Sequence, residues 1–200
     1  MPANGISVNL EKSKAIQTWP TPCNVKYVRP FLGLANYFHI FICEYSPKAI
    51  PLTNLTWSDV PWTWDDQREG AAFRSIQQAL IAAPVLQMPN FTNPFEVITD
   101  ASQDPGACDA VLMQDGHPIA FESRKFSPVE LRYTVTELEL LAVVHALRVW
   151  RCYLEGSQFT VVTNHNPLTF LETQQSLSRR QARWSKFFQQ FVFQWEYRPG

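Results

Sequence analysis

Three positions far apart in the sequence carry oxygen-bearing side chains where they could meet. Asp100 ends an apolar strand pattern in "FEVITDAS", and Asn164 ends a similar pattern in "FTVVTN". Glu139 falls in the first turns of a predicted helix, on one face with Val143 and Ala146. A carboxylate on an apolar face is costly unless it has a partner. Carboxylates that face each other repel unless cations bridge them, which is the setting for Mg²⁺ and for phosphodiester hydrolysis by a metal pair.

Simpler interpretations of the two acids stay open. Thr136 with Glu139, and Thr134 with Glu137, both have the spacing of a capping box. Glu139 is therefore either a cap partner or, if Glu137 closes the box, a carboxylate available for other work. Asp100 taken alone also fits an ordinary turn residue at the end of a strand.

Neutral and paired polar residues give two further candidates. Asn164 is a turn residue or a ligand position without charge, and Asn166-Pro167 already supplies the cap and first position of the next helix. Asp65 and Asp66 in "WTWDDQ" are paired like the aspartates of polymerase metal sites. They open a helix and no strand hairpin surrounds them, so we interpret them as helix N-caps.

Basic residues gather late, in "LSRRQARWSKFF". Arg179, Arg183 and Lys186 fall roughly on one helical face, with Arg180 beside them and aromatic residues between. The segment is either a face that follows phosphates or the solvated side of an amphipathic helix. His145 lies alone in the central helix and is interpreted as a packed histidine, not a ligand.

The elements that must position these residues change character along the chain. Helical periods dominate before residue 85, and strand patterns dominate after residue 94. The second part has the order β-β-β-α-β-α-α-β, which predicts an α/β fold with a mixed five-stranded sheet and helices on its faces. We place the division at residues 1–88, a small helical segment, and 89–200, the domain with the sheet.

Composition limits the class of protein. The chain has 200 residues with 46% hydrophobic and 18% charged, which suits a globular fold. The net charge of −1 excludes a global basic field, so nucleic-acid binding needs a local patch. The four cysteines are far apart, which argues against zinc and disulfides and predicts reduced, mostly buried thiols. Without an apolar leader or spanning segment, we expect an intracellular protein, cytoplasmic or nuclear, with no membrane contact.

Four stretches covering nearly the whole chain resemble one family. They are "AIQTWPTPCNVKYVRPFLGLANYF", "AAFRSIQQALIAAPVLQMPNFTNPFEVITDAS", the long run from "GHPIAFESRKF" to "NHNPLTFL", and "LSRRQARWSKFFQQFVFQWEYRPG". The sequence is similar to the C-terminal part of the reverse transcriptase of Ty3/gypsy-type LTR retrotransposons. The resemblance implies a thumb/connection-like helical segment, 1–88, followed by an RNase H-like domain, 89–200. The polymerase palm has no counterpart here.

The resemblance also implies roles for the candidate residues. RNase H domains of this type use four carboxylates and Mg²⁺ to cleave the RNA strand of an RNA–DNA hybrid. Asp100 in "ITDAS" corresponds to the first acid and Glu139 in "TELELLAVV" to the second. The third acid is an aspartate in "TDH", where this chain has Asn164 in "TNH". The fourth lies a short way after "YRPG", beyond the last residue of this sequence.

These departures set the functional expectation. Mg²⁺, or Mn²⁺ in its place, is expected to bind weakly or not at all at Asp100 and Glu139, so hydrolysis is predicted to be weak or lost. The loop after "TDAS" looks lengthened, and Asp104 or Asp109 within it could replace a missing ligand. The alternatives are a non-catalytic module that binds nucleic acid or a protein partner, and a decaying element without selected function. Whether the chain is an enzyme stays open.

Overall fold

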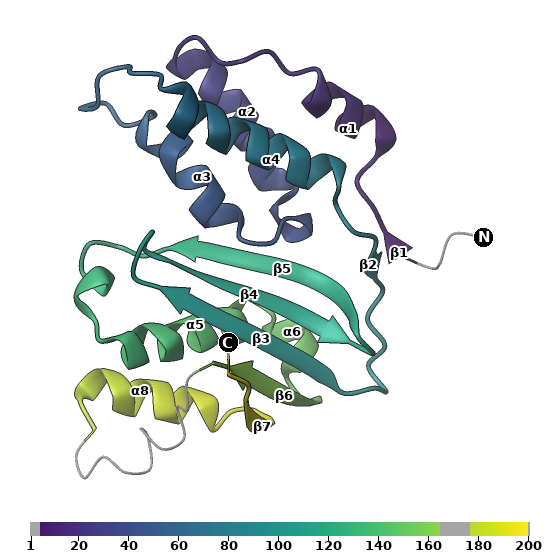
Figure 1. Ribbon diagram of the computed structural model, residues 1–200. Coiled ribbons are helices and arrows are strands. Elements are labelled where there is room, and N and C mark those ends of the chain that lie inside the picture. Colours follow the sequence, from purple (N-terminus) through teal and green to yellow (C-terminus); the bar gives the residue numbers. More distant parts are fainter. Residues whose placement is uncertain (1–4, 165–176, 200) are drawn as a thin grey trace.

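The computed structural model describes residues 5–164 and 177–199. Its first half is a layer of helices (Figure 1): α1 (Leu10–Gln17), α2 (Val25–Tyr37), α3 (Tyr45–Asn54) and α4 (Ala71–Ile81), with the short turns η1 (His39–Phe41) and η2 (Asp66–Gly70). Phe31, Leu52 and Ile76 are fully buried in its core. A two-stranded pairing of β1 (Gly5–Ile6) with β2 (Leu86–Gln87) joins the two ends of this helical layer.

Side-chain caps start α2 and η2. The side chain of Asn24 accepts a hydrogen bond from the backbone N–H of Lys26, and that of Asp65 accepts one from Gln67. Such caps satisfy backbone donors that have no partner within the helix. Pro30 lies within α2, although a proline inside a helix removes one backbone donor, and the helix continues to Tyr37.

The second half is built on a five-stranded sheet with the order β5-β4-β3-β6-β7. The strands are β3 (Phe95–Ser102), β4 (Ala107–Gln114), β5 (His117–Lys125), β6 (Gln158–Thr163) and β7 (Val192–Tyr197). The pairs β3–β4 and β4–β5 are antiparallel, whereas β3–β6 and β6–β7 are parallel. The predicted mixed α/β sheet is therefore confirmed, with β3 at its centre.

Helices cover the two faces of the sheet unequally. α5 (Val135–Val149), α6 (Arg151–Leu154) and α8 (Arg179–Phe188) lie on the side opposite the helical layer (Figure 1). α5 is apolar on most sides, and Leu140 and Leu147 are fully buried against the sheet. Each such leucine contributes roughly 1.5–3 kcal/mol of burial energy. On the other face, η1 and α3 contact β5, so the helical layer lies over that edge.

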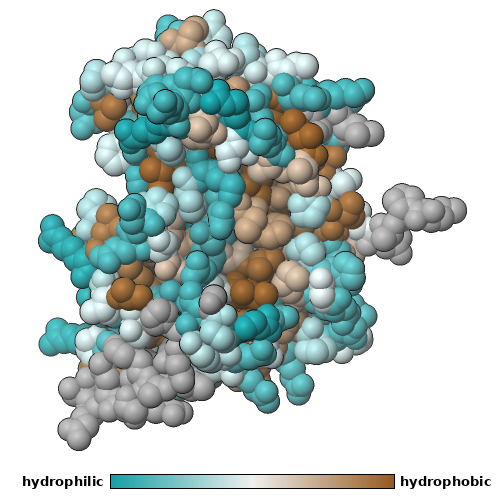
Figure 2. All heavy atoms as spheres, viewed as in Figure 1, coloured by the Kyte–Doolittle hydropathy of each residue, from teal (hydrophilic) through white to brown (hydrophobic). Residues whose placement is uncertain are grey.

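The remaining features concern short segments, the domain boundary and the surface. A short 3₁₀ turn, η3 (Glu130–Arg132), precedes α5. The helix predicted in "NPLTFLETQ" lies outside the described residues, and the division between residues 88 and 89 stays a prediction. No helix in the described ranges is long and apolar enough to cross a membrane. Figure 2 shows apolar residues among polar ones on one face, with a group at mid-height where the helical layer meets the sheet.

Candidate functional site

The sheet brings Asp100 and Asn164 side by side. Strands β3 and β6 run parallel, with Thr99 opposite Thr163, so the next residue of each chain segment is a neighbour. The amide Nδ2 of Asn164 donates a hydrogen bond to Oδ1 of Asp100 over 2.9 Å. Asp100 is exposed, and Asn164 is half-buried. The side chain at position 164 therefore faces the first candidate acid, as the strand pattern predicted.

Glu139 approaches the same place from α5. The backbone N–H of Ala101 donates to its carboxylate, and its side chain is buried, with 2% exposed. Burial, and next the negative charge of Asp100, raise the pKa of Glu139 to about 8, while the bond from Ala101 opposes the shift. A carboxyl with this pKa holds its proton at neutral pH.

The capping alternative for Glu139 is wrong. Thr134 caps α5, its side chain accepts from the backbone N–H of Glu137, and Glu137 Oε2 accepts from the Thr134 backbone N–H at 3.1 Å. Glu137 therefore closes the capping box, which leaves Glu139 two residues deeper in the helix and turned toward the sheet. The structure brings Asp100, Glu139 and Asn164 together, and their roles as catalytic or metal-binding residues stay a prediction.

The side chains that meet at this place carry little negative charge in the structure. One exposed carboxylate, one buried carboxyl and one neutral amide meet there. The side-chain amide of Asn164 donates an N–H to the carboxylate of Asp100. An acid at position 164 would instead place a second negative charge beside Asp100. Within residues 5–164 and 177–199, no group of three or more His, Cys, Asp or Glu side chains is arranged to hold a metal.

A further acid, Asp109, lies opposite Asp100 on the neighbouring strand β4. We expected Asp109 in a lengthened loop, but β4 begins at Ala107 and its register is regular here, with Asp100 opposite Asp109. The loop prediction was wrong for this residue. The strand that the pattern "ACDAVLMQDG" predicts already contains Asp109 and is confirmed as β4, in which successive side chains point to opposite faces.

Asp109 is partly buried and has other acidic residues nearby. Burial, Glu44 and Asp100 raise the pKa of its carboxyl to about 7, against the opposing charge of Lys48. A cavity of about 140 Å³ between the helical layer and the sheet is lined by Glu44, Asp100 and Asp109, among others. Glu44 begins α3 in the left-handed conformation, with φ 55°. Sequence reasoning missed Glu44, since no local pattern links it to the sheet.

The basic helix α8 divides into exposed and packed residues. Arg179, Arg183 and Lys186 are exposed. Arg180 instead lies over the ring of Tyr133, 3.6 Å from its centroid, and pairs with Glu137 at 3.3 Å.

The aromatic residues of α8 serve mainly the core. Trp184 is buried in the sheet domain, and Phe187 packs against the same core with the guanidinium of Arg148 above its ring. The binding role predicted for Arg179, Arg180, Arg183 and Lys186 stays a prediction, although these contacts give Arg180 a structural function as well.

Other singled-out residues have ordinary roles. Asp65 caps η2, and Asp66 pairs with Arg74 at 2.9 Å, in agreement with the interpretation as residues that open a helix. His145 packs in α5 with Nε2 3.1 Å from Glu122 Oε1. All four cysteines are free, but only Cys108 is buried, so the prediction of mostly buried thiols was wrong.

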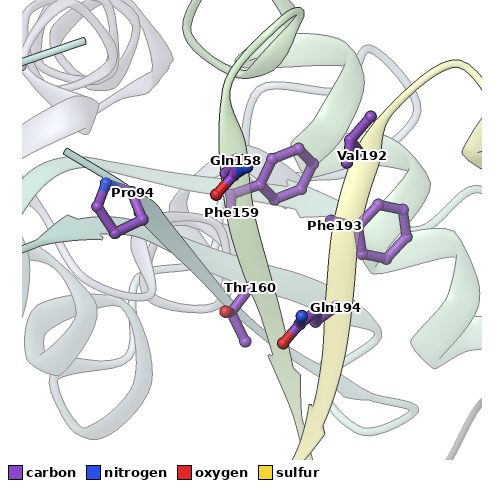
Figure 3. Close-up of a pocket in the computed structure, with 7 residues that line it drawn as sticks. All are labelled: Pro94, Gln158, Phe159, Thr160, Val192, Phe193 and Gln194. Carbon is purple, nitrogen blue, oxygen red and sulfur yellow. The ribbon is translucent and has the colours of Figure 1, made fainter. Parts of the chain in front are cut away.

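A larger hollow of about 460 Å³ lies elsewhere, at the start of β6 and β7. Figure 3 shows its polar side chains, Gln158, Thr160 and Gln194, on the two strands, with Pro94 beside them. None of its lining residues carries an acid or a base. The acidic convergence around Asp100 is therefore the stronger candidate for chemistry.

Comparison with known proteins shows the family of the chain. The model of the RNase H-like domain found in reverse transcriptase matches residues 90–191. The chain is 36% identical over 197 residues to the Retrovirus-related Pol polyprotein from transposon 297 of Drosophila melanogaster, covering 98% of this chain and 18% of that protein. It is 37% identical over 201 residues to the Transposon Tf2-3 polyprotein of Schizosaccharomyces pombe, covering 96% of this chain and 15% of that protein.

Solved structures agree on the fold. A foamy viral protease-reverse transcriptase in complex with double-stranded DNA matches with a TM-score of 0.82 and 23% identity, over 98% of this chain and 36% of that one. A foamy viral protease-reverse transcriptase in complex with an RNA/DNA hybrid matches with a TM-score of 0.79 and 23% identity, over 96% of this chain and 27% of that one. The chain spans less than a quarter of the length of the curated relatives described above. Because the family model matches half of its residues, this chain belongs to the family of RNase H-like domains found in reverse transcriptase, and it is similar to those of Ty3/gypsy-type retrotransposons.

Proposed function

We propose that this chain is a retrotransposon-derived fragment that binds RNA–DNA hybrid or related nucleic acid and cleaves its RNA strand weakly or not at all. Residues 1–88 would act as a thumb/connection-like segment beside the RNase H-like domain, residues 89–200. The foamy viral relatives in complex with double-stranded DNA and with an RNA/DNA hybrid support nucleic acid as the partner.

The hydrogen bond from Asn164 to Asp100 carries the proposal of impaired hydrolysis. An amide at this position adds no negative charge, so of these three positions only Asp100 and Glu139 could offer a carboxylate to Mg²⁺ or Mn²⁺. Loss of a charged partner at a desolvated site typically costs about 2–5 kcal/mol. A loss of about 4 kcal/mol in the transition state lowers a rate roughly a thousandfold.

Cleavage of a labelled RNA–DNA hybrid in Mg²⁺ and in Mn²⁺ tests this. The expected result is little or no product from the chain, with no further decrease for Asp100→Asn. Robust cleavage that Asp100→Asn abolishes would overturn the impairment and show that another acid, for which Asp109 is the nearest candidate, completes the site. Asp109→Asn would then identify it.

A binding role without catalysis is favoured by the exposed residues of α8. Arg179, Arg183 and Lys186 are exposed within two helical turns, at a spacing suited to phosphates. The affinity for the hybrid should fall steeply with salt concentration. Arg183→Ala should reduce the slope of log affinity against log salt concentration by about one. Lys12→Ala, an exposed cation of α1 at the far side of the molecule, is the matched control. Absent or salt-insensitive binding would point to a protein partner instead.

A further inference from the structure

One carboxylate, that of Glu122 on β5, lies between two histidines from opposite sides of the sheet. Its Oε2 is 3.3 Å from Nε2 of His39 in η1, and its Oε1 is 3.1 Å from Nε2 of His145 in α5. The Glu122 side chain is 13% exposed, His39 29% and His145 21%. The carboxylate therefore joins the helical layer to the helix that supports the sheet from below.

The geometry at His39 requires a charged ring. Its Nδ1 lies 2.6 Å from the backbone carbonyl oxygen of Asn36, and its Nε2 faces the Glu122 carboxylate. Both partners are acceptors, so both ring nitrogens must donate, and only the imidazolium carries two N–H groups. In agreement, the hydrogen bond to Glu122 raises the pKa of His39, against the opposing effect of burial. Burial alone would raise the pKa of Glu122, but the two histidines lower it to about 2.

Other titratable groups near this carboxylate keep their charge state near neutral pH. Burial raises the pKa of Tyr45, on α3 beside His39, and of Cys108, on β4, to about 12 each. Arg124, on the same strand as Glu122, is paired with Glu130 at 2.9 Å. Tyr45, Cys108 and Arg124 therefore do not change charge in the pH range where His39 does.

Additional contacts across the same interface do not titrate near neutral pH. The backbone N–H of Ser46 donates to Oγ of Ser123 over 2.7 Å, and Nζ of Lys125 donates to Oδ1 of Asn54 over 3.1 Å. Neither bond titrates, so each weakens only if the helical layer itself loosens from β5. Deprotonation of His39 removes one N–H, so the ring must give up either Asn36 or Glu122.

We propose that His39 and Glu122 form a proton-operated latch between the helical layer and the RNase H-like sheet, closed while His39 is protonated and loosened when it is not. The direction follows from linkage: a pKa raised by folding gives stability that is complete below about pH 6.5 and is lost as the pH rises through the folded value. Residues 43 and 44, which follow η1, line the cavity with Asp100. Opening of the latch would therefore loosen one wall of that cavity.

Amide exchange at Ser46 reports the latch directly, because this N–H crosses the interface. After correction for intrinsic rates, protection of Ser46 in the whole chain should fall about three- to tenfold between about pH 6 and pH 8.5, the loss of one ionic hydrogen bond. In Glu122→Gln and His39→Gln this dependence should vanish. Asp109→Asn should keep it, which separates the latch from the carboxyl of Asp109 that also titrates at this interface.

The ring resonances of His39 in the unaltered chain give a second test, which does not depend on whether the variants fold. They should titrate above the ordinary value of about 6.5. Titration at or below that value, or pH dependence at Ser46 that persists in Glu122→Gln, would overturn the proposal. Neither measurement uses nucleic acid, so failure here leaves the proposed function untouched.

Discussion

The substitution Asn164→Asp tests the electrostatics of the acidic site without an enzyme assay. It removes the N–H that Asn164 donates to Asp100 over 2.9 Å and puts a second carboxylate in its place. Two charges at about 4 Å repel by about 4 kcal/mol at an effective dielectric constant of 20. Because Asp100 is exposed, solvent screening reduces this to about 1–2 kcal/mol. The lost hydrogen bond adds about 1 kcal/mol.

The variant should therefore be about 2–3 kcal/mol less stable in chelator, which lowers Tm by about 4–12 °C for a chain of this size. Mg²⁺ should restore the loss, because the cation neutralises the new pair. At about a hundredfold excess over Kd, bound cation adds about 2.7 kcal/mol. The original chain should show a much smaller Mg²⁺ effect. Thermal unfolding with and without Mg²⁺ measures both.

Asn164→Ala is the matched control, since it removes the donor without adding charge. It should lose about 1 kcal/mol and gain no response to Mg²⁺. Equal stability of Asn164→Asp and the original chain in chelator would refute the reasoning. An equal Mg²⁺ response in all three proteins would do the same, since it would place the cation elsewhere.

Four further substitutions separate local effects. Arg180→Ala should lower the free energy of unfolding by about 1 kcal/mol through loss of its ring stacking and ion pair; unchanged urea unfolding would contradict this. Ser178→Ala removes the capping box of α8 and should lower it by a similar amount in the same assay. Gly33→Ala should raise it by about 0.5–1 kcal/mol, because an added Cβ meets nothing within 4 Å in α2; a lower Tm would argue against this. Asp109→Asn should stabilise by about 1–2 kcal/mol above pH 7, after allowance for screening, with the difference vanishing near about pH 4. The sign follows because folding raises the pKa of Asp109 to about 7, so this carboxyl lowers stability as the pH rises toward that value.

Most of the sheet domain could be predicted from local patterns. Alternating residues in "FEVITDAS" and the apolar helix around Leu140 specify a strand and a doubly packed helix, and both occur. The caps at Asn24 and Asp65 also follow from sequence. The uninterrupted course of α2 through Pro30 did not, because tertiary packing around Phe31 outweighs the missing backbone N–H.

The candidate site was predictable where strand ends determine it, and not where the helical layer contributes. Asp100 and Asn164 meet because parallel strands place equivalent positions side by side. Glu44 and His39 approach the sheet through the packing of α3 and η1, a long-range contact that no local period encodes. The structural function of Arg180 depends on Tyr133 in the same way.

The register of β6 has one more consequence. Its main chain is hydrogen-bonded on both sides, to β3 and to β7, up to Thr163. The backbone leading into the adjoining position is thus secured by its neighbours, whatever side chain is mounted there. An exchange of amide for carboxylate at position 164 would therefore change the charge of the site without changing the path of the main chain.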